Sequence, residues 1–142
     1  MVKTVVWFGQ SGSERYASNL ASSEISVINF RTYSEVVDVI KTTDFSFLII
    51  DSYAGVDRRS GSPNILEDGA GYDEARVDIL GEVLGVLRTS RANKDAQVIL
   101  LHRRNDSLRT HPGLVDRVNL SIPLKEGLSP TDVSKIVKRY II

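Results

Sequence analysis

Short apolar runs separated by amphipathic segments dominate the pattern of this chain. Runs rich in β-branched or aromatic residues predict strands at residues 4–8, 45–50, 97–101 and 118–122, with a weaker strand at 25–30. Most of these runs are continuous rather than alternating, which is typical of strands covered on both faces in a parallel sheet. Polar and apolar residues alternate in the run at 118–122, which therefore predicts an edge strand.

The segments between the strands carry helix signals. Residues 11–14 (Ser-Gly-Ser-Glu) and 32–35 (Thr-Tyr-Ser-Glu) both have the spacing of a capping box, in which a hydroxyl and an acid three residues later satisfy the first N–H groups of a helix. Ser129, followed by proline and then an acid at the third position, predicts the start of a last helix.

Two further helices are expected in the second half of the chain. Apolar residues at helical spacing predict one at 73–87, and Gly81 and Gly85 within it would let the helix pack closely on the sheet. The other falls somewhere in 106–117, where the triplet His-Pro-Gly at 111–113 interrupts the pattern.

The alternation of strands and helices predicts the fold class. It specifies an α/β domain with a five-stranded, doubly wound parallel sheet and helices on both faces. A length of 142 residues suits a single domain spanning residues 1–142. The anomaly is a glycine-rich loop at about 52–72; loops of this length in compact domains are either functional or mobile insertions.

Composition narrows the classes of function. Lys+Arg and Asp+Glu both number 18, so a formal net charge of zero argues against bulk electrostatic binding to nucleic acid or to an anionic membrane. The absence of cysteine excludes disulfides, thiolate chemistry and the common structural zinc sites. No apolar stretch approaches the roughly 18 residues that span a bilayer, and the first apolar run is too short for a signal peptide, so we expect a cytoplasmic protein.

Asp51 is the candidate functional residue with the clearest position. It directly follows the apolar run Phe47-Leu48-Ile49-Ile50. Because a carboxylate is costly to bury, it is expected at the carboxyl edge of the sheet, where open α/β folds bind their ligands.

With Asp51 at that place, the chain resembles a response-regulator receiver domain over essentially all of its length. The resemblance rests on the order of the elements, on the run that ends at Asp51, on the run Val98-Ile99-Leu100-Leu101 and on the last helix. It implies a flavodoxin-like, three-layer sandwich in which Asp51 occupies the phospho-acceptor position of two-component signalling.

Other motifs of the receiver family are absent. The acidic pair that holds Mg²⁺ in receivers corresponds here to Gly9 and Gln10, so we expect no metal site and no cofactor. The switch hydroxyl at the end of the fourth strand is replaced by His102, for which a partly exposed, structural role is the simpler interpretation. The lysine that should precede Pro123 is replaced by isoleucine, and Lys125 would approach Asp51 only if the last strand were shifted by two residues.

Two groups of residues allow a different interpretation. Ser11, Gly12 and Ser13 could form an anion-binding loop at the start of a helix, as in flavodoxin-type proteins, although plain helix capping uses the same residues. His102 and Arg103 begin a cationic run that could line the rim of a site with Lys125, or could be a solvated surface.

The residues therefore predict a pseudo-receiver, a signalling module that works through protein–protein interaction without conventional Mg²⁺-dependent phosphorylation. Its expected partner is a sensor kinase or a downstream regulator, and a homodimer is compatible with the sequence. Residues 118–142 would form the docking face. The alternatives are a flavodoxin-like protein that binds a nucleotide or another small phosphate-containing ligand, and a response regulator that is phosphorylated on Asp51. No set of catalytic residues is recognisable, so we do not expect an enzyme.

Overall fold

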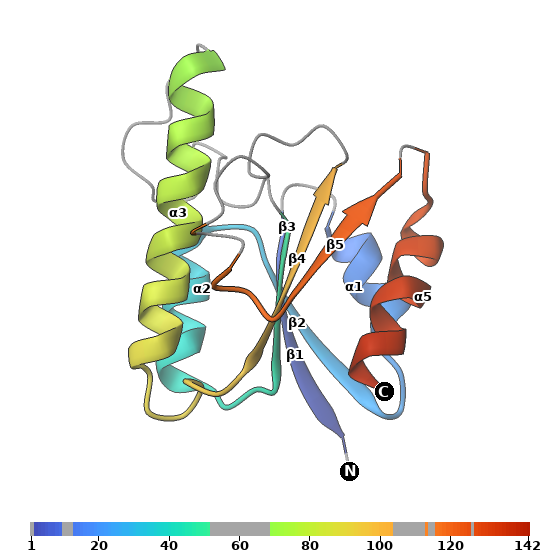
Figure 1. Cartoon of the computed structure of the whole chain (residues 1–142). Helices are drawn as coiled ribbons and strands as arrows, with labels where there is room; N and C mark the ends of the chain where they lie inside the picture. The colour runs from blue at the N-terminus through green and yellow to red at the C-terminus, as the bar shows by residue number, and fades with distance from the viewer. Residues whose placement is uncertain (1, 10–12, 52–68, 104–112, 114–115, 126) are drawn as a thin grey trace.

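The computed structural model describes residues 2–9, 13–51, 69–103, 113, 116–125 and 127–142, and for residues 69–77 and 103 it describes the backbone. Five parallel strands form one sheet in the order β2-β1-β3-β4-β5 (Figure 1). The sheet confirms the predicted α/β, doubly wound fold. The strands are β1 (Lys3–Phe8), β2 (Ile25–Phe30), β3 (Phe47–Asp51), β4 (Gln97–Arg103) and β5 (Leu120–Leu124).

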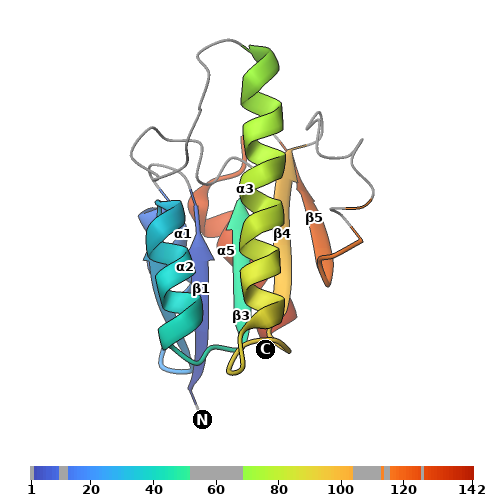
Figure 2. The same ribbon diagram turned by 90° about the vertical axis from the view of Figure 1, so that its left-hand side faces the viewer.

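Helices cover both faces of the sheet. α1 (Glu14–Leu20) and α5 (Pro130–Ile141) lie on one face, and α2 (Tyr33–Thr42) and α3 (Gly69–Thr89) lie on the other (Figures 1 and 2). The first turns of α3 extend past the carboxyl edge of the sheet (Figure 2). None of the helices within the described ranges is long and apolar enough to cross a membrane.

Several predicted boundaries need correction. α3 begins at Gly69, so the last four residues of the predicted loop at 52–72 are helical; residues 52–68 lie outside the described residues. β3 begins at Phe47 rather than at residue 45, β4 continues to Arg103, and β5 runs two residues later than predicted. Of the predicted helix in 106–117, only residues 113, 116 and 117 are described.

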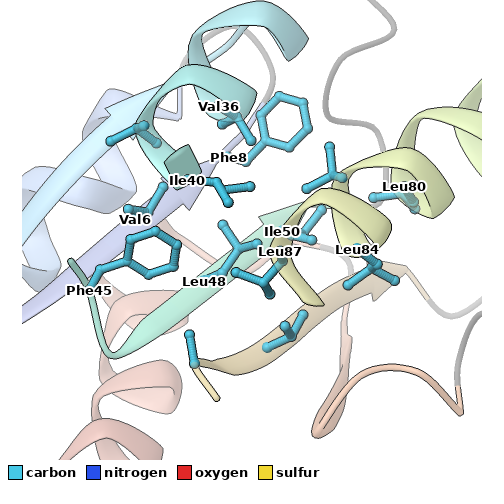
Figure 3. Packing of buried hydrophobic residues seen from close by; sticks show 14 of the residues in the cluster. Val6, Phe8, Val36, Ile40, Phe45, Leu48, Ile50, Leu80, Leu84 and Leu87 are labelled. Carbon is cyan, nitrogen blue, oxygen red and sulfur yellow. The ribbon is translucent and has the colours of Figure 1, made fainter. Parts of the chain in front are cut away.

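Alternation along the strands produces two hydrophobic cores. Val6, Phe8, Leu48 and Ile50 point toward α2 and α3, where they meet the apolar side of both helices (Figure 3). Intervening strand residues such as Trp7 and Ile49 belong to the second core with α1 and α5. Two-sided burial explains why the strand sequences are continuously apolar.

The predicted helix caps have mixed outcomes. Ser129 forms a complete capping box with Asp132, as predicted. Thr32 accepts the backbone N–H of Glu35 at 3.3 Å, and its hydroxyl donates to the Glu35 carboxylate at 2.5 Å. α1 begins at Glu14 with Ser13 at its N-cap position, and the Ser13 side chain makes no capping hydrogen bond with the described residues. Ser11, whose hydroxyl would cap the helix in the predicted box at 11–14, lies outside the described residues.

Asn93, in the turn between α3 and β4, connects backbone segments near the amino ends of β3 and β4. Its side chain is 1% exposed and makes three hydrogen bonds. The amide Nδ2 donates to the carbonyls of Ile40 (2.8 Å) and Thr43 (2.7 Å), and Oδ1 accepts the N–H of Phe45 (2.9 Å). One side chain thereby satisfies backbone groups at the end of α2 and in the connection to β3.

Gly81 and Gly85 do not face the sheet, contrary to the prediction. A Cβ built at Gly85 would meet no atom within 4 Å, and one at Gly81 would meet the Arg117 guanidinium at 3.8 Å. The neighbours that pack on the sheet are Leu80 and Leu84. Nothing in the described surroundings therefore requires glycine at either position.

Asn93→Ala is expected to lower the free energy of unfolding by about 3 kcal/mol, because it leaves three backbone groups without their partner. Urea denaturation measures the loss. Asn19→Ala is the matched control, since the exposed Asn19 side chain donates to the Arg15 carbonyl and accepts from the Thr131 hydroxyl where water can replace both partners, and it should change stability by less than about 0.5 kcal/mol. Equal losses in the two variants would show that Asn93 has no special role.

Gly81→Ala and Gly85→Ala should each raise the free energy of unfolding by about 0.5–1 kcal/mol, because alanine restricts the unfolded chain and favours the helix. Gly127→Ala provides the contrast in the same denaturation series. Its φ of 79° lies in the left-handed region, so the substitution should destabilise the protein by roughly 1 kcal/mol. Destabilisation by either helix substitution would contradict the open geometry.

Candidate functional site

The carboxyl edge of β1 and β3 is the point where the winding of the sheet changes direction. β1 is followed by a strand on one side of it and β3 lies on its other side, so the two strands flank the topological switch point. Phe8 pairs with Ile50 in the last row shared by these strands, and Gly9 and Asp51 are the residues that directly follow this row on the two strands. This is where ligands bind in open α/β sheets.

Asp51 is the last residue of β3 and is partly buried, directly after three residues that are fully buried. It pairs with Leu101 of β4, and Leu101 in turn pairs with Ile122 of β5. The row of the sheet that contains the carboxylate is therefore apolar on the β4 side.

Gly9 occupies the first of the two positions where the receiver resemblance implies acids, while Gln10 lies outside the described residues. The Gly9 N–H donates to the Phe30 carbonyl at 3.0 Å, which continues the β1–β2 ladder. A Cβ at Gly9 would lie 2.3 Å from Ser13 Cβ and 3.2 Å from Trp7 Nε1. The space of a side chain at this position is already filled.

Ser13 is the described member of the predicted anion-binding loop; Ser11 and Gly12 lie outside the described residues. The Ser13 side chain is 2% exposed, and its Oγ accepts a hydrogen bond from Asn29 Nδ2 at 2.9 Å. The hydroxyl therefore points into the protein rather than toward a ligand at the surface.

His102 lies one residue beyond the row of Asp51, paired with Pro123. It is 8% exposed, so the prediction of a partly exposed histidine is wrong: the extension of β4 to Arg103 carries position 102 into the sheet instead of ending before it. Arg103 ends the strand, and its side chain is outside the described residues.

Lys125 directly follows β5 and is exposed. The register places Ile122, and not a lysine, in the row of Asp51. Leu124 is two residues and two strands away from Asp51, a Cα separation of roughly 12 Å at usual sheet spacings. Lys125 lies beyond it, so the two-residue shift of the strand boundary does not bring this lysine into the Asp51 row.

The magnesium ion implied by the resemblance does not fit the described residues. Mg²⁺ requires several oxygen ligands in near-octahedral geometry. Gly9 offers no side-chain oxygen, and its surroundings leave no space for one. Across the ranges that the structure describes, no group of three acidic, histidine or cysteine residues could hold a metal.

Sequence reasoning did not identify Asn29 as part of this region. Its Nδ2 also donates to the Trp7 carbonyl at 3.2 Å, so it connects the end of β2 with β1 and with Ser13. The available signal was an amide near the carboxyl end of an otherwise apolar strand run.

Comparisons with known proteins identify the fold. No protein-family model and no curated protein matches the sequence. Among solved structures, the phosphorylated cyanobacterial phytochrome response regulator RcpA is similar with a TM-score of 0.62 and 16% identity, covering 99% of this chain and 91% of that chain.

Two further structures are similar to the same extent. A response regulator from Thermotoga maritima has a TM-score of 0.61 and 13% identity, covering 99% of this chain and 98% of that chain. A CheY-like receiver domain protein from Methanospirillum hungatei JF-1 has a TM-score of 0.61 and 11% identity, covering 99% and 94%. At identities this low, the similarity shows the arrangement of the backbone but not the role of any residue. The chain has the fold of a response-regulator receiver domain.

Proposed function

We propose that this protein is a pseudo-receiver, a non-enzymatic signalling module of receiver fold that binds a partner protein and is not phosphorylated on Asp51 by the Mg²⁺-dependent route. The observation that carries the proposal is the filled space at Gly9. Gly9 follows β1 at the switch point, next to the strand that ends at the acceptor-like Asp51, and a magnesium ligand would have to project from this position.

Electrostatics explains why this position matters. Transfer of a phosphoryl group to a carboxylate brings two negatively charged groups together, and catalysis depends on cations that neutralise the oxygens. Asp51 remains at the strand end, but Ile122 occupies the β5 position in its row and Lys125 lies further along the chain. These features favour a protein that has an acid at the acceptor position but does not undergo Mg²⁺-dependent phosphorylation there.

The proposed partner is another protein, either a sensor kinase or a downstream regulator, and a second copy of the chain is compatible with the same surface. β5 and α5 form the proposed docking face. Tyr140 on α5 is 52% exposed, and Lys135, Lys138 and Arg139 of the same helix are also exposed. An exposed aromatic ring and exposed cations on one helix favour an acidic protein surface. We place the module in the cytoplasm.

Binding of a small phosphate-containing ligand receives less support. Of the three loop residues that would bind it, Ser13 is described, and its hydroxyl accepts the Asn29 amide inside the protein. No described feature favours this alternative over the pseudo-receiver.

Incubation with acetyl phosphate and Mg²⁺ is expected to leave the intact mass of the protein unchanged, because Gly9 and Gln10 supply no carboxylate at the positions where a receiver holds the metal. Mass spectrometry under non-acidic, rapid conditions measures the outcome, with RcpA as the phosphorylatable control. A stoichiometric mass increase that disappears in Asp51→Asn would establish instead a response regulator that uses Asp51.

A photo-crosslinking amino acid at position 140 should capture a protein partner in an extract of the native cells. The same residue at position 38, exposed on α2 across the sheet, is the control and should capture none of that partner. Mass spectrometry of the adduct separates a second copy of the chain from a different protein. Equal capture from both positions, or none from position 140, would rule out the α5 face.

A further inference from the structure

We infer that Trp7 and Gly9 at the end of β1, Ser13 at the start of α1 and Asn29 of β2 form a close-packed contact, here called the β1–α1 joint, which occupies the space that an acid at position 9 would need. An acid at position 9 therefore cannot be introduced without opening this contact. The β1–α1 joint deepens the proposed function, since close packing explains why no metal ligand projects from position 9. The packing itself is argued from the surroundings of Gly9 and can be tested separately from the proposed function.

Steric contact is the first part of the argument. A Cβ at Gly9 would lie 2.3 Å from Ser13 Cβ and 2.7 Å from Ser13 Oγ. Ser13 Cβ is bonded directly to the backbone, so a change of rotamer cannot move it away. Any side chain at position 9 must therefore displace the backbone of β1 or the start of α1.

Trp7 constrains the joint on its aromatic side, by a less severe contact than that of Ser13. Trp7 Nε1 would lie 3.2 Å from the new Cβ, and the Trp7 side chain is 1% exposed. Its ring stacks on Tyr16 of α1 with centroids 5.8 Å apart and an interplanar angle of 25°. Moving the indole would disturb the contact between the sheet and α1.

Hydrogen bonds from Asn29 hold Ser13 in place. Asn29 Nδ2 donates both to Ser13 Oγ at 2.9 Å and to the Trp7 carbonyl at 3.2 Å. The Ser13 carbonyl accepts the N–H of Ala17 at 3.1 Å. Ser13 is thus tied to β1, β2 and α1 together, and its displacement would separate a buried hydroxyl from its partner.

A double-mutant cycle on melting temperature tests the joint. Gly9→Ala should lower the melting temperature by roughly 4–12 °C, because it overpacks the contact with Ser13. In the Ser13→Gly background the same substitution should cost less than half as much, since its main contact is gone. If Gly9→Ala alone fails to fold, a folded double variant Gly9→Ala/Ser13→Gly supports the inference in the same way. An equal cost in both backgrounds, or none in either, would overturn the inference.

Gly85→Ala is the matched control for the cycle. A Cβ there meets nothing within 4 Å, so this glycine-to-alanine change should not lower the melting temperature. A similar fall in the control would trace the effect to glycine chemistry in general, and would overturn the role of the joint.

Gly9→Asp tests the consequence for metal binding. Isothermal titration with MgCl₂ to about 10 mM should show no more binding to this variant than to Gly85→Asp, which adds the same charge in open space. A millimolar or tighter site in Gly9→Asp alone would overturn the inference. Phosphorylation of the unmodified protein would instead overturn the proposed function and leave the packing result intact.

Discussion

Burial of β3 on both faces is the constraint on which this structure depends. Leu48, Ile49 and Ile50 are all fully buried, so helices must cover each side of the sheet and the neighbouring strands must pair along its length. The first charged side chain can occur only where the cover ends, which is at Asp51. The position of the candidate site is thus a consequence of how the core is built, before any question of its chemistry arises.

Sequence patterns could predict the architecture because two-sided burial leaves a local signature. Continuous apolar runs located most of the described strands, an alternating run located β5, and the Ser129 cap located α5, since all of these signals depend on neighbouring residues. Boundaries at the carboxyl edge were less accurate. Leaving His102 and Arg103 out of β4 followed from their polarity, whereas the strand continues because β5 pairs with it as far as Leu124.

The site was harder to predict because its state depends on contacts between distant segments. The sequence shows that Gly9 supplies no carboxylate, but it does not show that Ser13 fills the vacant space. Ser13 matched a capping pattern, and the amide of Asn29, sixteen residues later, determines where its hydroxyl points. A hydrogen bond between residues so far apart leaves no periodic pattern in the sequence, so it can be identified only once β2 is known to lie beside β1.

The stack of Trp7 on Tyr16 has a practical consequence. Trp7 is the single tryptophan of the chain, and it lies at the end of β1, buried between the sheet and α1. When light that tyrosine does not absorb is used for excitation, the fluorescence of the protein originates from Trp7 and reports on this boundary. The unlabelled protein contains an intrinsic optical reporter of how α1 sits on the sheet, and the wavelength of its emission distinguishes a dry contact from one that water has entered.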